Sequence, residues 1–223
     1  MKLKTVKIKN FRGYKNQIDI EFNELTAFIG KNDAGKSTIL EALEIFFNNS
    51  LVSCEKEDLN INANNSDIEI SCVFSDLPVN IVIDTSSETT LKNEFLLNDD
   101  NLLEVKKVYR INSSKPKAAT YIVCNHPSAL SYNDLLSRKI TELREIANMF
   151  EIESGTYNAS SSVSLRNTIW ANAENLELKL QDLPVDKEDS KKIFASLEKY
   201  LPIYSLFQSD RPSKDNDKEV TDP

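Results

Sequence analysis

Residues 25–47 read LTAFIGKNDAGKSTILEALEIFF, and this stretch decides the fold. The apolar run from Leu25 to Ile29 ends at Gly30, which predicts a short buried strand that feeds a tight loop. From Lys36 the apolar residues recur at helical spacing, so we expect a helix that stops at 48–50. Strand, glycine loop and helix in this order predict an α/β fold with the loop at its functional edge.

The loop has the spacing Gly-x-x-x-x-Gly-Lys-Ser, which predicts a phosphate-binding loop for a nucleoside triphosphate. Glycines let backbone N–H groups wrap the phosphates, and the positive end of the helix dipole points at the same oxygens. Lys36 would lie between the β- and γ-phosphates, Ser37 would ligate Mg²⁺, and Thr38 would reach the α-phosphate. A plain glycine turn is the alternative, and the expected strand and helix around the loop argue against it. The predicted nucleotide-binding residues of the loop are Gly30, Lys31, Asn32, Asp33, Ala34, Gly35, Lys36, Ser37 and Thr38.

The rest of the chain divides into a β-rich part and a helical part. We expect a mixed sheet around the loop, a β-meander beside it, and a helical segment that returns to a short strand. The predicted domains are 1–130 (the ATP-binding lobe with the β-rich segment), 131–207 (helical segment and strand) and 208–223 (a polar linker toward a further lobe). Alternation predicts strands near 5–9, 18–22, 68–74, 80–84, 102–111, 119–124 and 203–207, and helical spacing predicts helices within 133–150, 165–180 and 190–200.

Composition is that of a soluble globular protein, with 40% hydrophobic and 28% charged residues among 223. No stretch approaches the ~20 apolar residues of a membrane span. The first ten residues, MKLKTVKIKN, hold too many lysines for a signal peptide, so the cytoplasm is the expected location. We expect Cys54, Cys72 and Cys124 to be reduced thiols, and the single histidine, His126, to lie in a loop without a metal.

Basic residues are concentrated at the N-terminus. Residues 1–15 hold six basic and no acidic side chains, so the net charge of −8 divides into +6 there and −14 elsewhere. Such an edge permits a restricted DNA contact. The alternative is the solvated face of an edge strand, where lysines discourage aggregation.

Two sequence signals place the loop in a family. The guanine-reading Asn-Lys-x-Asp of GTPases and the Arg-rich lid of nucleotide kinases are both missing. The first strand and turn read IKNFRGY and the loop helix reads FIGKNDAGKSTILEALEIFF; together, over residues 1–47, they resemble the N-terminal ATPase lobe of the SMC, RecF and OLD families, a branch of the ABC-type ATPases. Asp33 stands where most SMC and RecF loops have glycine, and resembles OLD-type loops. The end of the chain, from residue 201, is similar to a segment of OLD- and SMC-like defence ATPases.

The resemblance implies two further contacts. The arginine of the Asn-Phe-Arg turn lies near the nucleotide in these families, which maps to Arg12; a surface arginine on a turn is the alternative. A glutamine that ends the first lobe senses Mg²⁺ and the attacking water, which maps to Gln208; an exposed loop amide is the alternative. The expected metal-binding residues are therefore Ser37 and Gln208, and the expected cofactors are ATP and Mg²⁺.

The catalytic base is unknown in this sequence. An ABC-type head needs an apolar strand that ends in Asp-Glu, but Asp84 is followed by Thr85. It also needs a Ser-Gly signature, and Ser154-Gly155 lacks the residues that should follow. We therefore expect the base in a further lobe beyond residue 223, no appreciable hydrolysis by these residues alone, and a preference for adenine over guanine nucleotides.

The leading hypothesis from this resemblance is an ATPase head that dimerises on ATP and acts on DNA. Bacterial anti-phage defence or DNA repair is the expected setting, the SMC-like subunit of a Lamassu-type system is the narrowest form, and an effector nuclease subunit is a possible partner. One alternative is the ATPase lobe of an OLD-family Toprim nuclease. A third is a non-catalytic interaction module that uses ATP to join two surfaces.

Overall fold

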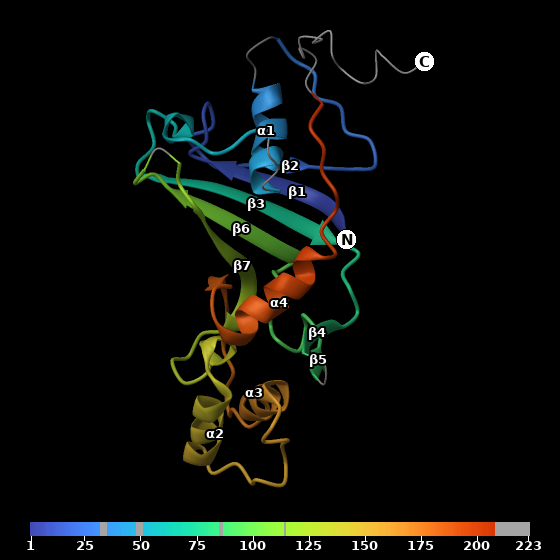
Figure 1. Cartoon of the computed structure of the whole chain (residues 1–223), viewed down its shortest axis with the longest axis vertical. Helices are drawn as coiled ribbons and strands as arrows, with labels where there is room; N and C mark the ends of the chain where they lie inside the picture. The colour runs from blue at the N-terminus through green and yellow to red at the C-terminus, as the bar shows by residue number, and fades with distance from the viewer. Residues whose placement is uncertain (32–34, 48–50, 85–86, 114, 208–223) are drawn as a thin grey trace, which may run out of the picture.

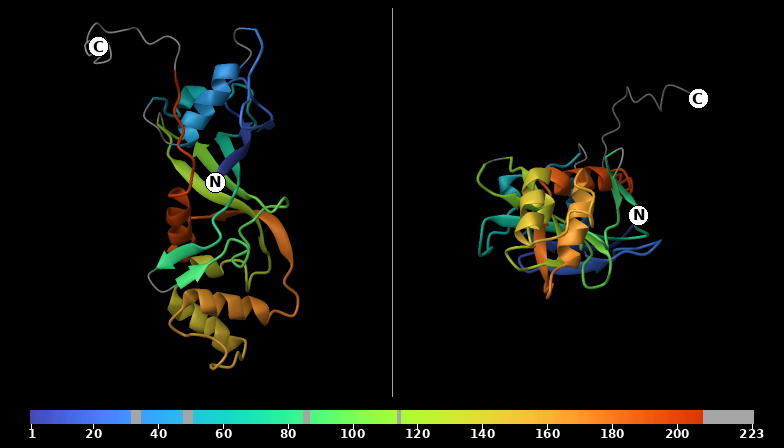
Figure 2. Two further views of the ribbon diagram at one scale, coloured as in Figure 1. Left: turned by 90° about the vertical axis from the view of Figure 1, so that its right-hand side faces the viewer. Right: turned by 90° about the horizontal axis from the view of Figure 1, so that it is seen from below.

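The computed structural model describes residues 1–31, 35–47, 51–84, 87–113 and 115–207. The molecule is elongated, with α1 at one end and the pair α2–α3 at the other (Figures 1 and 2). The strands are β1 (Lys2–Lys9), β2 (Ile18–Glu21), β3 (Asp67–Ser75), β4 (Ile81–Asp84), β5 (Ser87–Thr89), β6 (Leu103–Arg110), β7 (Ala118–Pro127) and β8 (Leu178–Pro184). The helices are α1 (Lys36–Phe46), α2 (Ile140–Met149), α3 (Ser162–Ala171) and α4 (Glu188–Glu198), with short 3-10 turns η1 (Lys56–Asp58) and η2 (Leu135–Ser137).

Six strands form one sheet in the order β2-β1-β3-β6-β7-β8, and a separate hairpin pairs β4 with β5. Every pairing between the described strands is antiparallel, so the sheet is not mixed as predicted. The predicted α/β class is confirmed, because helices and strands both build the fold. The basic strand β1 lies between β2 and β3, so it is not an edge strand. The strands expected near 68–74, 102–111 and 119–124 are found as β3, β6 and β7.

The helix after the glycine loop is anchored to the sheet at its C-terminal end. Lys107 Nζ on β6 donates to the carbonyl of Phe46 at 2.7 Å, and Tyr109 Oη donates to that of Ile45 at 3.1 Å. The last turn of a helix leaves carbonyls short of intrahelical partners, and these two bonds tie that turn to the sheet. On the other side, Tyr204 Oη donates to the carbonyl of Leu40 at 2.7 Å. The sheet and the segment that follows α4 therefore fix where the N-terminus of α1 lies.

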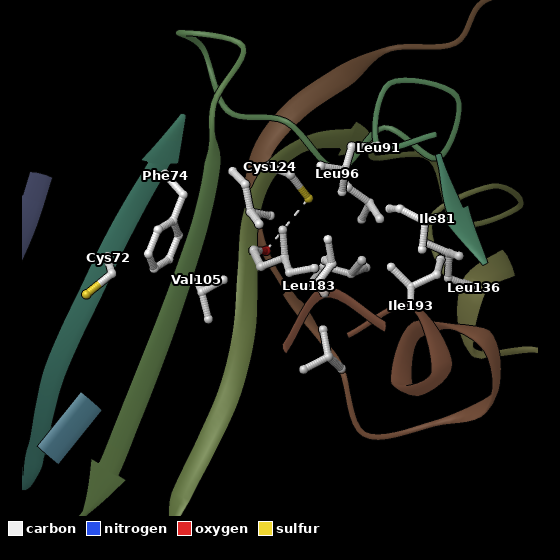
Figure 3. Packing of buried hydrophobic residues seen from close by; sticks show 14 of the residues in the cluster. Cys72, Phe74, Ile81, Leu91, Leu96, Val105, Cys124, Leu136, Leu183 and Ile193 are labelled. Atoms are coloured by element: carbon white, nitrogen blue, oxygen red, sulfur yellow. Dashed lines mark hydrogen bonds between the residues drawn. The ribbon is translucent and has the colours of Figure 1, made fainter. Parts of the chain in front are cut away.

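Between the sheet and α4 lies a continuous apolar core. Figure 3 shows Ile81, Leu136, Leu183 and Ile193 pointing into one cluster from β4, η2, β8 and α4. All four are buried, as are the three cysteines, which are free thiols as expected.

Two expected strands did not form. Residues 25–29 and 203–207 carry no strand, and Leu25, Ile29, Ile203 and Phe207 are 89%, 96%, 97% and 91% exposed. An apolar run becomes a buried strand only where a neighbour supplies hydrogen bonds and cover, and no described strand of the sheet pairs with either segment.

The expected helix at 165–180 is also shorter than predicted. α3 ends at Ala171, and Leu178 to Pro184 instead form β8, which pairs with β7. The leucines at 178 and 180 alternate with Lys179 and Gln181, which suits a strand, and the free hydrogen-bonding edge of β7 decides between the two periods.

His126 was predicted in a loop, and this was wrong. It lies in β7 with 0% exposure, its Nδ1 3.1 Å from the carbonyl oxygen of Phe95 and its ring edge-to-face with Trp170. Burial, assisted by the charge of Arg166, outweighs the hydrogen bonds to Phe95 and Glu94 and lowers the pKa of His126 to about 4. The neutral ring is therefore the form that the folded protein holds.

We expect this burial to make the protein sensitive to acid. Between pH 6.5 and 4 the unfolded chain protonates His126 while the folded protein does not, so the free energy of unfolding should fall as the pH drops, by up to about 3 kcal/mol from this group. His126→Asn, which keeps a donor for the carbonyl of Phe95, should flatten that decline in denaturant titrations run from pH 7.5 to 4. Parallel declines in the two proteins would contradict this assignment.

Candidate nucleotide-binding site

The glycine loop leads directly into α1. Of its nine predicted residues, Asn32, Asp33 and Ala34 lie outside the described part of the chain. Gly35 precedes α1 with φ +82° and ψ 7°, a left-handed conformation that favours glycine. A Cβ on Gly35 would come within 2.5 Å of the Tyr14 hydroxyl, so the position is closed to side chains for two reasons.

The N-terminal end of α1 suits an anion. Its N-cap residue, Gly35, has no side chain that could bond to the first N–H groups, and its first turn holds no acidic residue. Ser37 is exposed in that turn, and Thr38 is partly exposed. Uncapped backbone N–H groups and the positive end of the helix dipole together favour a phosphate.

Lys36 lies over the loop. Its Nζ donates to the carbonyl of Gly30 at 2.7 Å and to that of Lys31 at 2.6 Å. These backbone bonds bring both ends of the loop together around one ammonium group. The cation therefore sits where the loop closes on the start of α1, as phosphate binding requires.

Arg12 is close to this helix but already has partners. Its Nε donates to Asp58 at 2.8 Å and its Nη1 to Glu41 on α1, and its guanidinium lies 5.0 Å from the ring centre of Phe11. Burial opposes the charge, but the hydrogen bonds and charges of Asp58 and Glu41 outweigh it and raise the pKa of Arg12. To contact a phosphate, the guanidinium would have to exchange at least one carboxylate for it.

Tyr14 is a residue of the site that sequence reasoning missed. Its hydroxyl donates to the carbonyl of Gly35 at 3.2 Å. Tyr14 stands in the same turn as Arg12, but only the folded chain places it against the loop. The glycine of the motif is therefore in contact with the turn that follows β1.

The expected metal ligands, Ser37 and Gln208, stay a prediction. Gln208 lies outside the described residues. Ser37, exposed at the uncapped start of α1, could hold Mg²⁺ together with phosphate oxygens. Within the described residues no group of three or more His, Cys, Asp or Glu side chains is arranged to hold a metal by itself.

The two incomplete motifs, at Asp84 and at Ser154-Gly155, do not lie in the surroundings that a catalytic role requires. The strand that ends at Asp84 belongs to the β4–β5 hairpin and not to the six-stranded sheet that carries α1. Ser154-Gly155 lies in the connection between α2 and α3, at the opposite end of the molecule from α1 (Figure 1). Neither position therefore supports a role as the general base.

Comparison with known protein families gives a match over the whole chain. The family model described as an AAA ATPase domain matches residues 1–223. Among solved structures, the chain is similar to an SMC head domain from Thermotoga maritima, with 18% identity and a TM-score of 0.32, over 55% of this chain. The chain covers 37% of that structure's own length. No curated protein matches it.

Proposed function

This chain belongs to the AAA ATPase domain family, and from that premise we propose that it is the nucleotide-binding lobe of an ATPase head that binds ATP with Mg²⁺. Membership confirms the predicted P-loop ATPase class. The observation that carries the site is Lys36 folded onto the carbonyls of Gly30 and Lys31 at an uncapped helix N-terminus. Gly30 to Thr38 would hold the phosphates, with Ser37 on the metal.

The head is proposed to be completed by a second lobe. Leu25 and Ile29, in the segment before the loop, and Ile203 and Phe207, in the segment after α4, expose almost their whole side chains. Apolar surface left in water costs about 25 cal/mol per Å², and unpaired extended segments invite further strands. A lobe that pairs with these segments would bury both and could bring the carboxylate that polarises the attacking water.

Two such heads are proposed to close on ATP. The described residues would contact the phosphates from one side, through Lys36 and the first turn of α1. Arg12 lies close to the same helix, where it is paired with Glu41. Groups that grip the γ-phosphate from the other side would come from a second head. Because both heads then bind the same phosphate, assembly should depend on it.

We expect the intact protein to double in mass when a non-hydrolysable ATP analogue and Mg²⁺ are added, and to remain monomeric with ADP. Light scattering with each nucleotide checks this. Lys36→Ala should remain monomeric in every condition, whereas Lys191→Ala, an exposed lysine on α4, should behave as wild type. A protein that binds the analogue and stays monomeric would overturn the pairing.

DNA is a proposed partner, but the basic segment supports it less than its sequence indicated. A lysine or arginine that is already in an ion pair contributes less to counterion release on DNA. Of the six basic residues in this segment, Lys4 and Lys15 have no ion pair within the described part of the chain. The paired residues are Lys2 with Asp76, Lys7 with Glu104, Lys9 with Glu69, and Arg12 with Glu41 and Asp58.

The proposed setting is bacterial anti-phage defence or DNA repair in the cytoplasm, and an SMC-like subunit of a Lamassu-type system is its narrowest form. The alternative is the ATPase lobe of an OLD-type nuclease, because Asp33 resembles the residue found in OLD-type loops. No helix among the described residues is long and apolar enough to cross a membrane.

A further inference from the structure

The turn that follows β1 is a tight and internally bonded unit. Phe11 N–H donates to the carbonyl of Tyr14 at 3.0 Å, and Tyr14 N–H donates back to that of Phe11 at 2.9 Å. Arg12, between them, has φ +47°. A two-residue loop closed by two reciprocal bonds has little freedom, so the ring of Tyr14 leaves the turn in a defined direction.

The turn is also fixed from outside. Arg12 N–H donates to the carbonyl of Asp58 at 2.6 Å, and Asn60 N–H donates to that of Asn10 at 2.9 Å. Arg12 adds its side-chain bonds to Asp58 and to Glu41 on α1. The turn is therefore held by the 58–60 segment on one side and by the loop helix on the other.

Tyr14 links this rigid turn to Gly35, the loop residue that directly precedes α1. Gly35 has no side chain and sits at φ +82°, where glycine has wide conformational freedom. The Tyr14 hydroxyl bonds to its carbonyl at 3.2 Å and fills the place where a Cβ would stand. Rotation of the Gly35 peptide would break this bond, so the hydroxyl restrains how the first N–H groups of α1 point.

We propose that Tyr14 is a positioning residue for nucleotide binding, which acts by holding Gly35 in the conformation that presents the start of α1 to the phosphates. The inference rests on the proposed nucleotide site. Without the hydroxyl, the loop must be ordered when the phosphates bind, and that ordering lowers affinity. Tyr14 would act through Gly35 and would not touch the nucleotide.

Tyr14→Phe tests this with the loss of one oxygen. We expect the affinity for ATP and for ADP to fall about three- to tenfold, the worth of one neutral hydrogen bond, in calorimetric titrations of the intact, fully folded protein. Tyr121→Phe on β7 is the matched control and should leave both affinities unchanged. A purely structural role for Tyr14 would lower the melting temperature without changing the affinity of the folded protein.

A double-variant cycle with Gly35→Ala tests the contact itself. The Cβ of Gly35→Ala meets the hydroxyl, so this substitution should weaken ATP binding less in the Tyr14→Phe background than in wild type. Additive losses, or a Tyr14→Phe protein within twofold of wild type for both nucleotides, would overturn the role of Tyr14. Failure of the wild-type protein to bind ATP would instead overturn the proposed function.

Discussion

Lys36→Ala is expected to abolish ATP binding, with a loss of roughly a hundredfold or more in affinity. An ammonium that contacts two phosphates makes charge-assisted bonds worth about 1.5–3 kcal/mol each, and alanine removes both. Calorimetry of the purified protein with ATP and Mg²⁺ measures this directly. Undiminished affinity would mean that the nucleotide site lies elsewhere.

The fold should survive this substitution. Lys36 is partly exposed, and its described hydrogen bonds go only to the carbonyls of Gly30 and Lys31, both in exposed residues. Carbonyls that lose the ammonium can be hydrated, so we expect the free energy of unfolding to change by less than about 1 kcal/mol. Lys191→Ala on α4 controls for the loss of a lysine charge and should alter neither affinity nor stability.

Local sequence patterns predicted the elements whose apolar residues repeat with the period of the helix or strand. The helical spacing of Ile39, Leu43 and Phe46 gave α1, and all three are buried. The alternation of Val6 and Ile8 gave β1 for the same reason. In both cases the period of the apolar residues matches the geometry of the element, so one face is buried whatever the neighbours are.

Strands that form only by pairing with a distant segment could not be predicted from local patterns. The runs at 25–29 and 203–207 have strand-like composition but no described partner strand, whereas 178–184 became a strand because β7 offered an edge. The segment that holds His126 looked like a loop because a proline follows it, and that proline is the last residue of β7. Pairing between distant segments decides these cases, and it leaves little mark on the local sequence.

The residues of the candidate site also divide into those that a local motif predicts and those that depend on distant contacts. The loop motif is local, so Gly35 and Lys36 were identified from their spacing. The partners of Arg12 and the contact of Tyr14 with Gly35 join residues 21 to 46 positions apart, and no spacing rule links them. The phosphate-binding groups could therefore be predicted from local spacing, whereas the contacts that hold them in place could not.

At the other end of the molecule, Arg166→Met is expected to cost about 3–5 kcal/mol of stability. Arg166 on α3 is fully buried and binds Glu94 with two parallel bonds, at 2.9 Å from Nε and 2.8 Å from Nη2, while its Nη1 binds Asp189 on α4. Methionine would leave the buried carboxylate of Glu94 without a cation and that of Asp189 with Lys192 alone, and an uncompensated buried charge is penalised by this amount. Native domains have only about 5–15 kcal/mol in total, so partial unfolding at 37 °C is within reach.

A half-exposed arginine with the same number of carboxylate partners provides the matched control. Arg138 pairs with Asp134 and Glu142, but these side chains are about 40% exposed, so Arg138→Met should cost less than about 1 kcal/mol. Guanidinium titrations of both variants give the two free energies of unfolding.

The penalty should come from the stranded carboxylates and not from the lost arginine alone. A triple variant, Arg166→Met with Glu94→Leu and Asp189→Leu, removes the buried charges together and should recover most of the loss, because apolar replacements of a buried ion-pair network are often close to neutral. Ser162 and Lys192 also bond to Asp189, at the rim of the network, and hydration can replace those bonds when the carboxylate is gone. If Arg166→Met were as mild as Arg138→Met, the network would not be holding α3 and α4 to the segment of Glu94.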